Sequence, residues 1–552
     1  MNFLIVVPRF SNKGDFYAFP FGLAYISSYL KSKGFKVSVL NLCHFEEIIP
    51  TAEILGKKIA ETGTDAILTG GMSGHWNLIE DVLMAAKKIK PDIITIIGGP
   101  IMTADPNLAM ENMPIDYGVI GEGEITSGEL AEALQNVADP GGVNGLIYRR
   151  NGELVKTADR PAITDLDSLP FPDYEGFGYR EWMTTMKYSD QNPILENYDL
   201  VNYSPIIGSR SCPYSCTFCY HPLGKQYRQR SLENIFLEIE HLASTYGSNF
   251  ISFMDELFSI DTARMLELAE RIKKYDIHWE ACFRVNNVTA DLLSKLKASK
   301  LNYMGFGVES LSDPILKSMK KMITKAEIEN AFKLAREAGI FCSGNIILGD
   351  PAETEETIAE SMDWWKKNPQ YNLSLIFIKA IPDSEIYRYA LEKKLIKNKL
   401  DHARNNFPII NLTQIPDKRF DEIKRKVLSY RLSLDNLVAG ELLGSKKTDE
   451  KHGKQNFYQI KAKCPFCKQA HEYKRFLKST NRRLAIFCKN CYSSFKLDQK
   501  YIFYDEFNLL KMLSNFYTGR LYANFLKLNL IKPDNQKLIF LKQKVKKILN
   551  RN

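Results

Sequence analysis

The sequence has no apolar run close to the roughly 20 residues that a membrane-spanning helix needs, so it predicts no such helix. The segment Met1–Pro8 lacks the basic region and the small-residue cleavage site of a signal peptide, and it is typical of a first β-strand. Cysteine is scarce, at 10 among 552 residues, which excludes a disulfide-dense secreted scaffold. We therefore expect a cytoplasmic protein with reduced thiols, in which clustered cysteines indicate metal ligands.

The chain also has no large excess of charge of either sign. The 74 basic and 65 acidic residues leave a net charge of +9, which is modest for this length and does not single out nucleic acid as a partner. Apolar residues make up 45% of the chain and charged residues 25%, as in ordinary globular proteins. The length predicts about three to four domains.

Residues 1–140 alternate apolar strands with helices, which predicts a doubly wound, Rossmann-like parallel sheet in an α/β fold. The expected strands are Phe3–Val7, Lys36–Leu40, Ala66–Thr69, Ile93–Ile97 and Tyr117–Ile120. Ligands of such sheets bind at the carboxyl ends of the strands. Glycines lie at three of these ends, in Gly70-Gly71, Gly98-Gly99-Pro100 and Gly121-Glu122-Gly123-Glu124. They either admit a bulky ligand or make tight turns.

The rest of the chain divides into further segments. Residues 141–200 predict a hairpin and a proline-rich linker. Residues 201–400 repeat strand and helix six times, which fits a partial (β/α)6 barrel of the TIM type or an open sheet. The expected strands are Ser204–Gly208, Phe250–Met254, Trp279–Arg284, Tyr303–Gly307, Phe341–Ile347 and Leu373–Ile378. A helical connector (401–455), a four-cysteine module (456–500) and a basic helical tail (501–552) follow.

A three-cysteine motif, Cys212-x3-Cys216-x2-Cys219, follows the first strand of the second strand–helix segment. Three thiolates on one loop can hold three irons of a [4Fe–4S] cluster and leave the fourth iron open. S-adenosylmethionine (SAM) can bind that iron, and an electron from the cluster then releases a 5′-deoxyadenosyl radical. The alternative is a three-cysteine zinc site.

With this motif the chain resembles the radical SAM superfamily, and within it the subfamily with an N-terminal cobalamin-binding domain. The resemblance covers about residues 1–400 and includes Pro20–Ala24, Gly98–Pro100, Gly121–Glu124 and the linker Asp167–Tyr174. It implies that SAM is bound by Phe218, Tyr220, Asp255, Glu256, Arg284, Glu309 and Ser310. For the charged residues, a structural ion pair is the alternative.

The same resemblance implies that the first domain binds cobalamin, mostly through its backbone. The implied contacts are Thr69, Gly70, Gly71, Ser73, Gly98, Gly99, Pro100, Gly121, Glu122 and Gly123. The Asp-x-His-x-x-Gly motif that supplies a cobalt ligand in some cobalamin domains is absent, and we interpret His44 and His75 as polar or capping residues. The alternative is a domain retained only as a scaffold.

A second cysteine group predicts a closed metal site. Two Cys-x2-Cys knuckles give four thiolates, which close a tetrahedral site with no open position, as in a structural zinc ribbon. The ligands are Cys464, Cys467, Cys488 and Cys491. Rubredoxin-like iron and a second iron–sulfur cluster are the alternatives.

The resemblance favours a cobalamin-dependent radical SAM methyltransferase, which acts on an unactivated carbon of a lipid or another small molecule such as a specialised metabolite and takes electrons from a flavodoxin or ferredoxin. A non-methylating cyclase or carbon–carbon-bond-forming enzyme is the second hypothesis. A nucleic-acid-binding protein that uses the ribbon and tail is the third, and we do not expect it. Methylthio-transferring relatives need a second cysteine triad in the first domain, where only Cys43 lies. The tail is typical of a solvated helix end, with contact to an anionic membrane as the alternative.

Overall fold

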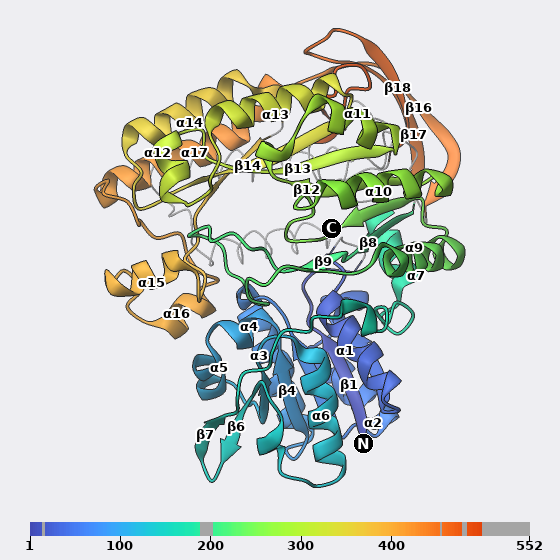
Figure 1. Ribbon diagram of the computed structural model, residues 1–552, viewed down its shortest axis with the longest axis vertical. Coiled ribbons are helices and arrows are strands. Elements are labelled where there is room, and N and C mark those ends of the chain that lie inside the picture. Colours follow the sequence, from blue (N-terminus) through green and yellow to red (C-terminus); the bar gives the residue numbers. More distant parts are fainter. Residues whose placement is uncertain (14–16, 188–201, 372, 453–454, 477–482, 499–552) are drawn as a thin grey trace. The chain divides into compact units, whose positions relative to one another are not determined.

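The computed structural model describes residues 1–13, 17–187, 202–371, 373–452, 455–476 and 483–498 (Figure 1). The predicted basic tail, 501–552, lies outside these residues. The chain forms two compact units. Unit 1 comprises Met1–Lys187, Asn202–Ile260 and Ala380–Phe407, and unit 2 contains Asp261–Lys379 and the described residues from Pro408 onward.

The core of unit 1 is a seven-stranded sheet with the order β2-β1-β3-β4-β5-β6-β7. Its first five strands are parallel and confirm the predicted doubly wound sheet: β1 (Asn2–Val7), β2 (Lys36–Asn41), β3 (Ala66–Gly70), β4 (Ile94–Gly98) and β5 (Tyr117–Val119). The predicted hairpin is also present, as β6 (Leu146–Arg150) and β7 (Glu153–Lys156). It pairs antiparallel with β5, so it extends the sheet beyond the five strands expected.

Helices cover this sheet because its central strands are apolar on both faces. The helices are α1 (Phe21–Ser32), α2 (Thr51–Thr62), α3 (Trp76–Ile89), α4 (Pro100–Ala104), α5 (Pro106–Asn112) and α6 (Gly123–Gln135). Helix α1 packs against α6, and α2 packs against α3. Leu4 and Val6 of β1 share a buried cluster with Leu55 of α2 and Val82 of α3.

The rest of unit 1 carries the cysteine loop. Its elements are α7 (Tyr179–Lys187), β8 (Tyr203–Ile206), β9 (Ser209–Arg210), β10 (Arg228–Gln229), α9 (Leu232–Tyr246), β11 (Phe250–Phe253), α15 (Glu385–Glu392) and α16 (Lys399–Arg404). Strands β8 and β11 pair in parallel, whereas β9 and β10 form a short antiparallel pair. The loop between β9 and β10 holds the three-cysteine motif.

Unit 2 continues the predicted alternation of strand and helix. Its elements are α10 (Thr262–Ile272), β12 (His278–Phe283), α11 (Ala290–Ala298), β13 (Leu301–Glu309), α12 (Asp313–Ser318), α13 (Lys325–Glu337), β14 (Phe341–Leu348), α14 (Glu355–Lys367), β15 (Leu373–Phe377) and α17 (Asp417–Leu437). The strands β12 to β15 pair in parallel in sequence order. With β8 and β11, all six strands predicted for 201–400 are present, each displaced by at most a few residues.

The strands that the structure describes in the C-terminal part of unit 2 pair antiparallel with one another. These are β16 (Glu441–His452), β17 (Gln455–Lys463) and β18 (Ala470–Phe476), followed by the hairpin β19 (Arg483–Phe487) and β20 (Ser494–Asp498). Strand β16 begins at Glu441, inside the segment predicted as a helical connector. Among the described helices, none is both long and apolar enough to cross a membrane.

Candidate active site and metal centre

The three-cysteine loop follows the carboxyl end of β8 and is closed at its base by the β9–β10 pair. The Cys219 N–H donates to the Cys216 carbonyl at 3.1 Å, which makes a tight turn around the last two thiols. Cys216 is buried, Cys212 is half-buried and Cys219 is exposed. The sequence therefore places all three thiols on one loop at the end of a parallel strand, where the chemistry of such folds gathers.

These thiols can bind either a single ion or a cluster, and the two kinds of centre hold the sulfurs differently. Across the described chain, the one set of three or more thiol, imidazole or carboxylate groups whose ligand atoms all lie within 4.8 Å is the C-terminal four-cysteine group. A single zinc ion would hold all its sulfurs at about 2.3 Å, whereas a cubane binds each thiolate through a different iron.

Next to this loop, Asp255 and Glu256 follow β11 and have different surroundings. Asp255 is buried and accepts hydrogen bonds from the Gly208 N–H at 2.7 Å and from Ser209 Oγ at 2.6 Å, so it fixes the turn that leads into β9. Glu256 Oε2 lies 3.8 Å from His221 Nδ1. Burial raises the pKa of Glu256 and lowers the pKa of His221, so both side chains are shifted toward their neutral forms.

The two aromatic residues of the loop also differ. Phe218 is half-buried on the turn between Cys216 and Cys219. The Tyr220 hydroxyl donates to the Pro100 carbonyl at 3.3 Å, and Pro100 belongs to the glycine-rich turn after β4. Burial raises the pKa of Tyr220, which keeps this hydroxyl a donor. Tyr220 thus contacts a turn that was predicted to bind cobalamin.

The remaining predicted SAM contacts lie in unit 2. Arg284, after β12, donates to the Lys321 carbonyl, and Lys321 Nζ pairs with Glu309 Oε1 at 2.8 Å. A Cβ at Gly307 would lie 2.5 Å from Lys321 Nζ, so a larger residue there would displace the end of the lysine side chain. Glu309 has a φ of +65°, a strained conformation for a residue with a side chain. Ser310 Oγ accepts from the Ser312 N–H at 3.2 Å.

Lys321 contacts both Arg284 and Glu309, and the sequence did not indicate this role for it.

Two further residues, Asp350 and Glu353, follow the carboxyl end of β14. Both have one buried carboxylate oxygen without a hydrogen-bond partner. Burial raises the pKa of Glu353 to about 8. Asp255 and Glu256 were predicted from the family resemblance, whereas Asp350 could have been found as a carboxylate that follows a predicted strand.

The glycines that follow β3, β4 and β5 form one edge of the seven-stranded sheet, here called the glycine edge, where the backbones pack closely. A Cβ at Gly70 would lie 2.5 Å from the Gly98 carbonyl oxygen, and a Cβ at Gly71 would lie 2.8 Å from His75 Nδ1. Gly99 and Gly121 have φ values of +83° and +78°, and a Cβ at Gly121 would meet nothing within 4 Å. The turns after β3 and β4 are therefore tight, while the turn after β5 leaves open space.

Two hydroxyl side chains predicted at this edge differ in their hydrogen bonding. Thr69 Oγ1 donates to the Val6 carbonyl at 2.8 Å, which ties it to the neighbouring strand. Ser73 Oγ is buried and has no hydrogen-bond partner. An orphaned hydroxyl beside a glycine-lined edge fits a ligand with polar groups, such as the side-chain amides of a corrinoid.

The two histidines of this domain have structural contacts. His75 Nδ1 accepts from the Met72 N–H at 3.3 Å, and its ring lies on Phe10 with centroids 4.3 Å apart. His44 Nε2 is 2.9 Å from the Tyr17 hydroxyl, and Nδ1 is 3.3 Å from Glu181. These contacts agree with our interpretation of both residues as polar or capping residues.

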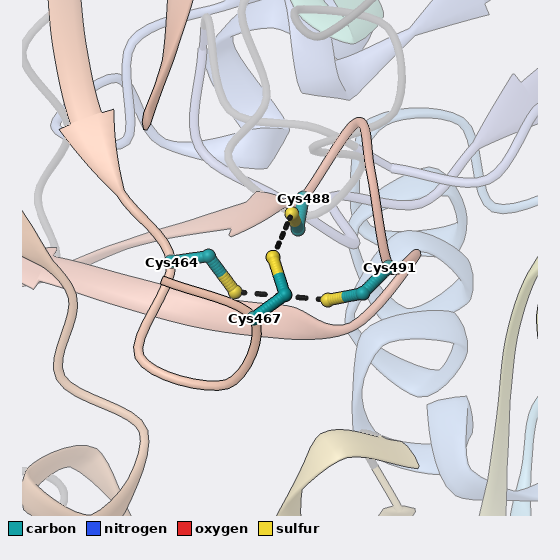
Figure 2. Close-up of side chains that lie close together, drawn as sticks. All are labelled: Cys464, Cys467, Cys488 and Cys491. Atoms are coloured by element: carbon teal, nitrogen blue, oxygen red, sulfur yellow. Dashed lines mark hydrogen bonds between the residues drawn. The ribbon is translucent and has the colours of Figure 1, made fainter. Parts of the chain in front are cut away.

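The four C-terminal cysteines converge on one point (Figure 2). The sulfur atoms of Cys464 and Cys491 are 3.7 Å apart, and those of Cys467 and Cys488 are 3.5 Å apart. Zinc–sulfur bonds of about 2.3 Å in a tetrahedron place the sulfurs about 3.8 Å apart. The geometry therefore fits one tetrahedral ion and is too compact for a cluster of several irons.

This module packs on the amino end of β14. Phe341, the first residue of β14, has ring centroids 4.4 Å from Phe487 and 5.1 Å from Tyr492. Arg336 Nε donates to the Cys491 carbonyl at 3.2 Å. The four-cysteine centre thus lies at the opposite end of β14 from Asp350, which indicates a structural rather than a catalytic centre.

Comparisons with known proteins identify two domains in this chain. Residues 12–131 match the B12 binding domain family, and residues 206–364 match the radical SAM superfamily. An uncharacterized methyltransferase of Pyrococcus horikoshii is 28% identical over 413 residues, covering 74% of this chain and 86% of the relative. An anaerobic magnesium-protoporphyrin IX monomethyl ester cyclase of Cereibacter sphaeroides is 28% identical over 395 residues, covering 67% and 62%.

Among solved structures, the fold is similar to that of the radical SAM methyltransferase TsrM from Kitasatospora setae. The TM-score is 0.59 at 18% identity, over 72% of this chain and 77% of that chain. The molecule is thus an α/β protein with a B12-binding domain ahead of a radical SAM domain. It belongs to the radical SAM superfamily and is an enzyme.

Proposed function

We propose that this enzyme is a cobalamin-dependent radical SAM methyltransferase that modifies an unactivated carbon of a lipid or a specialised metabolite. The observation that carries the proposal is the pairing, in one unit, of the three-cysteine loop with a glycine-lined edge that has an orphaned Ser73 hydroxyl. The Pyrococcus horikoshii relative, named a methyltransferase, supports it over most of its length.

The residues of the chain have separate tasks in this proposal. Cys212, Cys216 and Cys219 would hold a [4Fe–4S] cluster, which supplies the electron for SAM cleavage, while cobalamin carries the methyl group. The half-buried Phe218 offers a ring to the adenine of SAM. Glu309, aligned by Lys321, offers a carboxylate to the ribose hydroxyls. Around the cobalamin, the backbone of the glycine edge and Ser73 Oγ would supply hydrogen bonds.

Anaerobic reconstitution tests the proposal. The protein is loaded with iron, sulfide and hydroxocobalamin, passed through a gel-filtration column, reduced with dithionite and supplied with SAM. We expect the corrinoid to co-elute at about one per chain and 5′-deoxyadenosine to form. Formation of 5′-deoxyadenosine without retention of the corrinoid would contradict the methyltransferase and leave only the radical SAM activity.

A cyclase or another carbon–carbon-bond-forming enzyme is the second candidate. It is favoured by the cyclase of Cereibacter sphaeroides, which has the same 28% identity as the methyltransferase relative but is matched over 62% of its length instead of 86%. The two candidates differ in the mass of the product, because methylation adds one methyl group and cyclisation adds none. Either reaction takes its electrons from a one-electron donor such as a flavodoxin or ferredoxin.

We also propose that the ion of the four-cysteine centre is zinc. Its support is the sulfur spacing of 3.5–3.7 Å, together with thiolate ligands that leave no open position. Rubredoxin-like iron has the same geometry but gives the protein a visible absorbance of its own. Metal analysis of protein purified without added iron distinguishes the two ions.

A further inference from the structure

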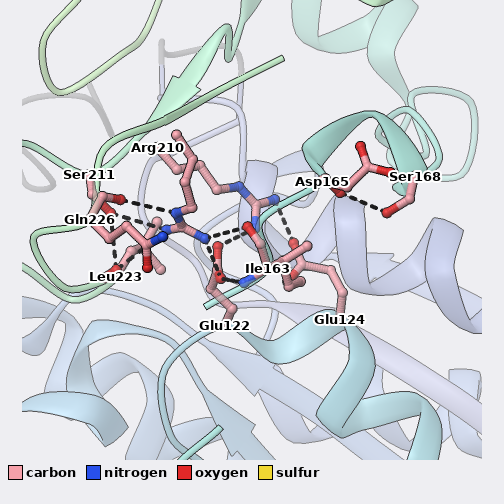
Figure 3. A network of polar contacts seen from close by, with 10 residues as sticks. Glu122, Glu124, Ile163, Asp165, Ser168, Arg210, Ser211, Leu223 and Gln226 are labelled. Atoms are coloured by element: carbon pink, nitrogen blue, oxygen red, sulfur yellow. Dashed lines mark hydrogen bonds and ion pairs between the residues drawn. The ribbon is translucent and has the colours of Figure 1, made fainter. Parts of the chain in front are cut away.

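A buried ion network in unit 1 joins the B12-binding domain to the base of the cysteine loop (Figure 3). Glu122 Oε1 pairs with Arg210 at 2.8 Å, and Glu122 Oε2 pairs with Arg228 at 2.6 Å. Glu124 Oε1 pairs with Arg210 at 2.6 Å. All four side chains are at most 8% exposed. The two carboxylates balance the two guanidinium groups, as buried charges require.

The other polar atoms around Glu122 are also paired. Glu122 Oε2 accepts from the Ile163 N–H at 2.7 Å, and Arg228 donates to the Ile163 carbonyl at 2.8 Å and to Ser211 Oγ at 3.1 Å. Burial alone raises the pKa of Glu122, but Arg210 and Arg228 lower it overall, so the carboxylate stays ionised at neutral pH. Such charge-assisted, multiply bonded contacts have a defined geometry.

The members of this network come from the segments that matter for the chemistry. Glu122 stands between Gly121 and Gly123 at the edge where cobalamin is expected. Arg210 ends β9, just before Cys212, and Arg228 begins β10, which closes the same loop. One carboxylate therefore contacts both stems of the cysteine loop.

We propose that Glu122 is a positioning residue that fixes the cysteine loop relative to the glycine edge of the B12-binding domain. This inference rests on the proposed function, in which both groups act on one substrate carbon. Displacement of a reacting group by about 1 Å can cost on the order of 100-fold in rate. If the network were only stabilising, its loss would lower the stability of unit 1 without changing the position of the cysteine loop relative to the glycine edge.

Hydrogen exchange and electron paramagnetic resonance test the role of Glu122 in the reconstituted holoenzyme. In Glu122→Gln, we expect exchange in 119–126 and in 209–229 to become about ten- to a hundredfold faster, because charge-assisted hydrogen bonds are lost. Exchange in β1 and β3 should not change. The distribution of the dipolar coupling between cob(II)alamin and the reduced cluster should become broader. Glu122→Asp, which keeps the charge, should restore part of the narrow coupling.

The matched control is Asp139→Asn, which removes an exposed ion pair with Arg150 in the same unit and should leave both measurements unchanged. If Glu122→Gln does not fold, Arg228→Lys replaces it, since it keeps the charge but removes the guanidinium group that bonds Glu122, the Ile163 carbonyl and Ser211 Oγ. A folded variant with wild-type exchange in 209–229 and wild-type spin coupling would overturn the proposal. If the wild type retains no corrinoid, the proposed function fails, while exchange in the two segments still decides whether Glu122 couples them.

Discussion

Replacement of Cys216 by alanine is expected to abolish the cleavage of SAM. Cys216 is the buried thiol of the loop, and its carbonyl accepts the hydrogen bond that forms the turn to Cys219. The substitution removes the thiolate but keeps this backbone contact. The two remaining thiolates cannot hold a cubane whose fourth iron must stay open. We therefore expect the variant to fold, to lose most of its iron and sulfide, and to form 5′-deoxyadenosine only at the background rate.

The matched control is Ser215→Ala, one residue earlier in the same loop. Ser215 is exposed, and its Oγ accepts from Lys225 at 2.8 Å. This variant should keep the iron content, the cluster signal in electron paramagnetic resonance and SAM cleavage. A Cys216→Ala protein with an intact cluster signal and wild-type cleavage would show that the cluster lies elsewhere. An equal loss of the cluster and of SAM cleavage in both variants would show that the effect comes from the structure of the loop and not from the thiolate.

The parallel strands were predictable because each is a short, continuous apolar run between helices. Strand β1, for instance, is buried along nearly its whole length, and its sequence reveals this directly. Strand β16 was missed for the opposite reason. Glu441–His452 is rich in charged residues and lies at the edge of its sheet. Edge strands often carry such charges, which removes the alternation of apolar and polar residues that identifies a strand.

The two cysteine groups could be recognised from the sequence because the cysteines of each group lie close together in the chain. The ion network around Glu122 was not, because its partners are distant in the chain. Glu122 is separated from Arg210 by 88 positions and from Arg228 by 106. From the sequence, Glu122 was predicted to contact cobalamin through its backbone. The direction of its side chain is visible only in the folded structure. Lys321, between Arg284 and Glu309, was hidden for the same reason.

Removal of the ion from the four-cysteine centre is expected to unfold the C-terminal module. The buried cluster around this centre is small, and Cys464 and Cys488 are themselves part of it. Structural zinc contributes about 10–16 kcal/mol to the folding of comparably small zinc modules. We expect Cys467→Ser to lose the ion, to exchange amide hydrogens rapidly in β17 to β20, and to show a lower melting temperature. Metal analysis and hydrogen exchange measure these effects.

Because this centre lies at the amino end of β14, we expect cluster binding and SAM cleavage to survive the loss of its ion. Because the cysteine loop lies in unit 1, Cys467→Ser should still bind its cluster and cleave SAM at temperatures well below the transition. Asn490→Ala is the matched control: Asn490 is exposed within the second knuckle and bonds Cys488 Sγ through its backbone N–H, so the loss of its side chain should change the free energy of unfolding by at most about 0.5 kcal/mol. An equal loss of iron–sulfur cluster and of zinc in Cys467→Ser would contradict a purely structural role. Acid-labile sulfide beyond one cubane per chain in the wild type would instead indicate a second cluster, against the compact sulfur spacing of 3.5–3.7 Å.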